Sequence, residues 1–130
     1  MMNKRVLHIG IASREAIKAR TIAIANGELR PSPDAPRIWF SSLESLAKVL
    51  SEKNMLLLDM IRRSRPASIA ELAQLSGRAV SNLSRTLHNM ERFGLIELRK
   101  SDGRTAPVVL YERLIFDLEV DGDEPTSRAA

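Results

Sequence analysis

Four polar side chains recur at helical spacing in the middle of the chain: Arg78, Ser81, Asn82 and Arg85. Separations of three and four residues place side chains on one face of an α-helix. Arginine can bind guanine through two hydrogen bonds, asparagine can bind adenine in the same way, and serine can bind a base or a phosphate. The chemistry expected of this set is hydrogen bonding to nucleic-acid bases. Any exposed helix face carries some polar residues, so the surrounding elements must decide whether the set is functional.

A short capped helix and a glycine turn precede these side chains. Ser68 and Glu71 have the spacing of a capping box, which predicts a helix of about two turns, and Gly77 supplies the turn. Ser68 and the amides at this helix start could also hold a phosphate. A second, longer helix is predicted over 78–92, with Gly94 as its C-terminal glycine. Its buried face is predicted from four apolar residues at helical spacing: Val80, Leu83, Leu87 and Met90.

A charged hairpin is predicted directly after this helix. Ile96 and Leu98 alternate with polar residues, Asp102-Gly103 is a strong two-residue turn signal, and the return strand is expected to start near Val108. A basic hairpin tip could reach the backbone or minor groove of DNA, or could simply keep the hairpin soluble. The basic residues at this tip are Arg99, Lys100 and Arg104.

The segments before the capped helix predict further elements. Residues 5–12 are typical of a strand, 14–26 of a helix, and RPSPDAP of a linker or extended arm. A capping box at Ser41 and Glu44 predicts the next helix, and Ser51 caps a continuation that Pro66 ends, as one bent helix or two. Arg62, Arg63 and Arg65 near its end could touch a DNA backbone or be a solvated helix end.

Three regions follow from this organisation. Residues 1–37 form an N-terminal strand and helix with a proline-rich linker, 38–120 form the main domain, and 121–130 form an acidic flexible tail. A last strand is predicted where Phe116, Leu118 and Val120 alternate with acidic residues.

The composition favours a compact protein with a polyanionic partner. The 130 residues are 44% hydrophobic but only 4% aromatic, and the net charge of +4 combines a basic body with an acidic tail. Arginine outnumbers lysine, which suits phosphate and guanine binding but also follows from GC-rich coding. The absence of cysteine excludes disulfides and thiolate metal sites and fits a cytoplasmic location. No apolar run is long enough to cross a membrane, and the start is not typical of a signal peptide.

No enzymatic, metal or cofactor chemistry is expected. The histidines, His8 and His88, have no cysteine or carboxylate cluster around them. The lone glycine of GIASREA lacks the spacing of a phosphate-binding loop, and no serine has the nucleophile-elbow pattern.

The region from about Trp39 to Val120 resembles the MarR-like winged-helix regulators, and more closely a group of small prokaryotic antitoxin-type or predicted transcriptional regulators. The fold class this implies is mainly α with a small β wing, a winged helix-turn-helix preceded by an N-terminal strand-helix element. The resemblance also implies a homodimer that occludes a promoter, with Ser81, Asn82 and Arg85 in base-reading places and Arg104 on the wing. The matching segments are FSSLESLAKVLSEKNMLLLDMIRR, SIAELAQLSGRAVSNLSRTLHNMERFGLIEL and APVVLYERLIFDLEV.

Three hypotheses follow. The first is a sequence-specific repressor of transcription that binds double-stranded DNA. The second is the antitoxin of a toxin–antitoxin pair, in which the RPSPDAP arm and the acidic tail fold onto a toxin protein. The third is a winged helix used only for protein–protein contact. Dimerisation is expected through the strand at 6–11 and the helix after it, which are too small to bury their apolar faces alone.

Overall fold

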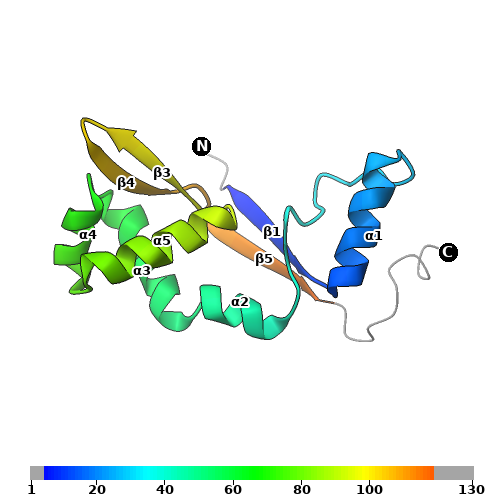
Figure 1. Ribbon diagram of the computed structural model, residues 1–130, viewed down its shortest axis with the longest axis horizontal. Coiled ribbons are helices and arrows are strands. Elements are labelled where there is room, and N and C mark those ends of the chain that lie inside the picture. Colours follow the sequence, from blue (N-terminus) through cyan, green and yellow to red (C-terminus); the bar gives the residue numbers. More distant parts are fainter. Residues whose placement is uncertain (1–4, 119–130) are drawn as a thin grey trace. The chain divides into compact units, whose positions relative to one another are not determined.

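The computed structural model describes residues 5–118 and divides them into two compact units, one of residues 47–112 with Arg5 and one of residues 6–46 and 113–118 (Figure 1). The middle of the chain therefore forms one unit, and the two flanking segments form the other. The elements in chain order are β1 (Val6–Ile11), α1 (Arg14–Ala25), β2 (Ile38–Phe40), α2 (Leu43–Val49), α3 (Glu52–Ser64), α4 (Ile69–Ser76), α5 (Val80–Arg92), β3 (Ile96–Ser101), β4 (Arg104–Val109) and β5 (Arg113–Leu118).

The unit of residues 47–112 is a winged helix-turn-helix, as the sequence predicted. Helix α5 contacts α4 and β3, and β4 contacts α3 and α4, so the hairpin of β3 and β4 closes over the helices. The carboxylate of Glu91 in α5 accepts the Leu98 amide at 2.9 Å and ties the hairpin to α5. The buried side chains that form the core include Leu57, Ile61, Leu72, Leu83, Leu87, Met90 and Ile96.

Serine caps set four of the helix starts, and at α1 the Ser13 hydroxyl accepts the Ala16 amide at 3.1 Å. The hydroxyls of Ser51 and Ser68 accept the amides of Asn54 and Glu71, which confirms both predicted caps. The cap of α2 is one residue later than predicted, because the hydroxyl of Ser42, and not that of Ser41, accepts the Ser45 amide at 3.1 Å. The sequence left open whether the segment between Ser41 and Pro66 forms one bent helix or two, and the structure has two separate helices, α2 and α3.

The start of α5 differs from the prediction. Leu83, Leu87 and Met90 are fully buried as expected, but Val80 is 52% exposed. Helix α5 begins at Val80, so this side chain lies in the first turn, at the end of the helix rather than over the core. Arg78, which the sequence placed in the helix, precedes it by two residues.

The second unit contains a parallel sheet with the order β2-β1-β5. The sequence predicted β1 and β5 as strands but not their pairing, and it did not predict β2, which is only three residues long. Helix α1 crosses over between β1 and β2, and the proline-rich segment lies within this connection. The structure therefore does not divide at residues 30–37, because β1, α1 and β2 belong to one sheet unit that β5 completes.

The two faces of this sheet differ. Trp39 lies over Gly10 so closely that a Cβ at position 10 would collide with the indole ring, and the Arg20 guanidinium of α1 lies 5.4 Å from the ring centroid. The opposite face carries buried Leu7, Ile9 and Phe40. The predicted acidic tail, 121–130, lies outside the described residues, as does Val120 of the predicted last strand.

Candidate nucleic-acid interface

Helices α4 and α5 are joined by a tight turn that presents one face of α5. Gly77 adopts φ 73°, a left-handed conformation that favours glycine, and donates its amide to the Ala73 carbonyl at 2.9 Å. Because the apolar face of α5 is buried, its polar face points outward. Ser81, Asn82 and Arg85 are all exposed on this face, as the sequence predicted.

Arg85 is one of the predicted base-reading residues that are available to a ligand. It is exposed, and within residues 5–118 it makes no hydrogen bond or ion pair that would hold the guanidinium against the protein. A guanidinium free of internal partners can offer its planar fork of donors to a ligand. The Arg85 side chain is therefore free to offer these donors to an anion or a base.

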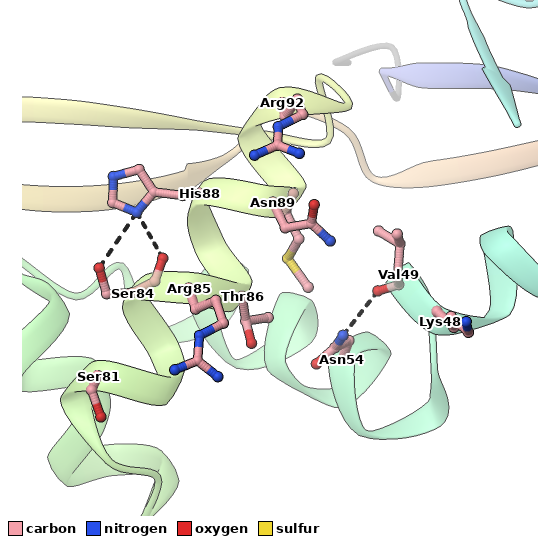
Figure 2. A pocket seen from close by; sticks show the side chains of 11 residues that line it. Lys48, Val49, Asn54, Ser81, Ser84, Arg85, Thr86, His88, Asn89 and Arg92 are labelled. Atoms are coloured by element: carbon pink, nitrogen blue, oxygen red, sulfur yellow. Dashed lines mark hydrogen bonds between the residues drawn. The ribbon is translucent and has the colours of Figure 1, made fainter.

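A hollow of about 740 Å³ runs beside this face of α5 (Figure 2). Figure 2 shows Arg85, Asn89 and Arg92 following one another along α5, with Lys48 and Asn54 on the other side. Three full cations line the hollow, and no carboxylate does, so its electrostatic potential favours anions. The residues that line it are Lys48, Val49, Asn54, Ser81, Ser84, Arg85, Thr86, His88, Asn89, Met90 and Arg92.

The sequence interpretation missed the cations Lys48 and Arg92. Arg92 follows Arg85 at a spacing of seven residues, two turns along the same face, so the helical period could have identified it. Lys48 comes from α2, and no local pattern connects it with α5.

His88 also lines the hollow, and the sequence indicates a surface or packing residue there, with contact to a phosphate as the alternative. Its Nδ1 lies 2.7 Å from the Ser84 carbonyl oxygen and 3.4 Å from the Ser84 hydroxyl. Because a carbonyl can only accept, Nδ1 carries the proton and donates to it, which leaves Nε2 as the outward nitrogen.

Arg78 is bound within the protein. Its Nη2 and Nε donate to Asn82 Oδ1 at 2.8 and 3.1 Å, Nη2 also donates to the Thr86 hydroxyl at 3.3 Å, and Nη1 donates to Asn54 Oδ1 at 3.4 Å. The side chain thus ties the start of α5 to α3. Base reading by Arg78 would require these bonds to break.

The same contacts restrict Asn82. Bidentate recognition of adenine uses the amide oxygen as an acceptor and the amide nitrogen as a donor. In this structure the Asn82 oxygen already accepts twice from Arg78, so only its nitrogen is free to donate. Asn82 is therefore exposed, but it is not prepared for bidentate reading.

The wing positions its three basic residues differently. Asp102 and Gly103 have φ of 52° and 73°, so both central turn residues adopt the positive φ expected of this hairpin. Ser101 pairs with Arg104, which puts Arg99 and Arg104 on one face and Lys100 on the other. Arg99 is ion-paired with Glu97, so Lys100 and Arg104 are the cations of the wing without an ion pair among the described residues.

The N-terminus of α4 is less suited to an anion than the sequence indicated. The Ser68 hydroxyl accepts the Glu71 amide at 3.0 Å, and the Glu71 carboxylate accepts the Ala67 amide at 3.2 Å. This carboxylate already supplies negative charge where a phosphate would bind. Farther back, Arg62 and Arg63 both pair with Asp59, at 3.4 and 3.0 Å, which favours a solvated helix end for that cluster.

Residues 5–118 offer neither a metal-binding cluster nor a membrane-spanning helix. That part of the chain contains no group of three or more histidine or acidic side chains able to hold a metal ion. None of its helices combines the length and the apolar character that crossing a bilayer requires.

Comparisons with known proteins place the chain in a family. A crystal structure described as the predicted DNA-binding transcriptional regulator from E. coli is 25% identical, with a TM-score of 0.46, over 72% of this chain and 84% of that chain. No curated protein matches the sequence. The model of the HVO_A0114 family matches residues 49–116, which is just over half of the chain and includes the whole helix-turn-helix and wing. This protein belongs to the HVO_A0114 family.

Proposed function

We propose that this protein is a sequence-specific regulator of transcription that binds double-stranded DNA. The observation that carries the proposal is Arg85, exposed and without an internal partner, on a cationic hollow that has no carboxylate in its lining. DNA presents a regular array of phosphates beside hydrogen-bonding base edges, and this surface offers partners for both. Binding, rather than catalysis, is the activity that these side chains support.

In the proposed complex α5 lies in the major groove. Residues in the N-terminal half of such a helix contact base edges. Arg85 would bind guanine through two hydrogen bonds, Ser81 would contact a base or a phosphate, and the Asn82 amide would donate one hydrogen bond. Lys48 and Arg92 would contact phosphates on either side of the hollow, and they set the register of the helix without reading sequence.

The wing would make the second contact. Lys100 and Arg104 flank the hairpin tip without ion pairs among the described residues, so either can neutralise a phosphate. Arg99 contributes less, because Glu97 already balances its charge. Removal of a wing cation should weaken binding to all sequences similarly, because phosphate contacts carry no sequence information.

We further propose that the protein acts in the cytoplasm as a homodimer that represses transcription by occupying a promoter. Two recognition helices related by a two-fold axis would read a palindromic operator in successive major grooves. The MarR-like and antitoxin roles rest mainly on the sequence resemblance. No contact in the described part of the chain favours a toxin partner, and the proline-rich segment that was its candidate arm lies inside the sheet unit.

Binding across a salt series tests the proposal. The full chain is titrated by fluorescence anisotropy onto a duplex from upstream of its own gene and onto a scrambled duplex of equal composition. We expect tighter binding to the first duplex, with log K falling against log salt concentration at about −0.9 per phosphate contact. Equal, weak binding to both duplexes would refute DNA regulation and favour the alternative of a winged helix that binds only proteins.

A further inference from the structure

Within residues 5–118, the sheet unit has one six-residue strand, β5, with no neighbouring strand along its outer edge. Strand β1 lies between β2 and β5, so it has a neighbouring strand on each side and cannot be the strand that pairs with a second copy. This finding argues against the sequence expectation that residues 6–11 pair across a two-fold axis. Among the described residues, β5 pairs with β1 alone, along one of its two sides.

Apolar side chains are exposed on this edge strand. Phe116 is 48% exposed and Leu118 is 49% exposed. An edge strand with exposed apolar residues and unpaired backbone groups is a template for another strand, and proteins usually block such edges with charges, prolines or covering segments. The charges on β5 are Arg113 and Asp117, which are opposite in sign and sit near its two ends.

These charges are placed symmetrically. In the segment Arg113–Asp117, Ile115 is central, with one apolar residue and then one charge on each side. If two copies of β5 pair antiparallel about Ile115, Arg113 of each copy lies opposite Asp117 of the other, which gives two ion pairs. Leu114 of each copy likewise lies opposite Phe116 of the other, and the two Ile115 side chains lie opposite each other. A register centred on Arg113 or on Asp117 would bring like charges together, whereas this one brings opposite charges together.

The faces of the sheet support the same register. Leu114 and Phe116 pair with Leu7 and Ile9 of β1 and share their apolar face, whereas Arg113 and Asp117 lie on the other face. A slip of one residue would turn the apolar face of the second copy to the opposite side. A slip of two residues in either direction would keep the faces but separate both charge pairs.

We propose that a second copy of this chain docks on β5, antiparallel and centred on Ile115, to form one continuous sheet through both protomers. The interface is isologous, as a two-fold dimer requires, because each copy contributes the same strand. The proposal rests on the homodimer part of the proposed function. It is tested without DNA, so that its failure remains distinct from a failure of DNA binding.

Introduced cysteines map the register, because the natural chain contains none. Opposite residues alternate between two spacings in an antiparallel pair, so one position of each kind is needed. Ile115→Cys alone should form a disulfide dimer under mild oxidation, or an equimolar mixture of Leu114→Cys and Phe116→Cys should do so. Arg113→Cys or Asp117→Cys alone provides the control, because in this register two copies of either position lie about 13 Å apart.

Charge reversal provides a second measurement that needs no disulfide. Sedimentation equilibrium of Arg113→Asp or Asp117→Arg should show a dimer weakened about tenfold, because two attractive pairs become repulsive. The double variant Arg113→Asp/Asp117→Arg should recover the wild-type dimer. A wild-type chain that stays monomeric at micromolar concentration refutes both the dimer and this interface. A stable dimer that neither cross-links nor responds to charge reversal keeps the dimer and refutes the interface.

Discussion

The most direct test of the proposed interface is Arg85→Ala. Arg85 has no internal hydrogen bond or ion pair among the described residues, so its removal should change the free energy of unfolding by less than about 0.5 kcal/mol. A bidentate contact with guanine contributes about 1–3 kcal/mol, which corresponds to a loss of about 5- to 150-fold in affinity at each half-site. The loss should be confined to the specific duplex. The measurement is anisotropy at fixed salt, with circular dichroism to confirm folding.

Two further variants distinguish base reading from mere charge. Arg85→Lys keeps the cation but loses the planar fork, so it should retain non-specific binding and lose most of the preference for the specific duplex. Arg63→Ala is the matched control, because Arg63 is an exposed arginine on α3 that already pairs with Asp59. If Arg85→Ala binds both duplexes as tightly as the wild type, α5 is not the reading helix and the proposed function fails.

Three other predictions follow from the packing. Leu87→Ala should lower the free energy of unfolding by about 2–5 kcal/mol in urea titration, since Leu87 is fully buried in α5, and a loss below about 1 kcal/mol would contradict its place in the core. Gly10→Ala should displace the indole of Trp39, the only tryptophan, and shift its fluorescence emission; an unchanged spectrum would mean that the ring does not lie over Gly10. A double-mutant cycle of Arg78→Ala and Asn82→Ala should give a coupling of about 0.5–1 kcal/mol in stability, whereas strict additivity would show that the hydrogen bonds do not persist in solution.

The helix-turn-helix and the turn of the hairpin could be predicted because their signals are local, but the return strand β4 begins at Arg104 and not near Val108. A serine cap, a glycine of positive φ or an Asp-Gly turn involves residues within four positions of one another, and Ser51, Ser68, Gly77 and Asp102 all behave as predicted. Where two local signals overlap, the outcome shifts by a residue. Ser41 and Ser42 both offer a hydroxyl, and only the structure shows that Ser42 is the cap.

The parallel sheet had no local signal. Strand β1 at residues 6–11 pairs with β5 at residues 113–118, across most of the described chain, and a single sequence contains no pattern that links segments so far apart. For the same reason, the sequence could not predict the contacts of the site that join residues far apart along the chain. Lys48 lies beside α5 only in the folded unit, and the hydrogen bond from Arg78 to Asn54 of α3 spans 24 residues. The two stronger hydrogen bonds from Arg78 to Asn82, by contrast, span only four residues.

The order of elements along the chain links the two halves of the proposed function. Strand β5 follows the wing directly. Strand β1 therefore cannot pair with β5 until the whole intervening segment has been synthesised. Contacts within the winged helix are mostly between elements adjacent in sequence, and these form faster than pairings that close a long loop. The edge proposed to bind a second copy therefore comes into existence only when the winged helix has already been synthesised and can fold. A dimer built on this edge would therefore form only between chains whose winged helix has already been synthesised, so that both recognition helices are present to bind DNA.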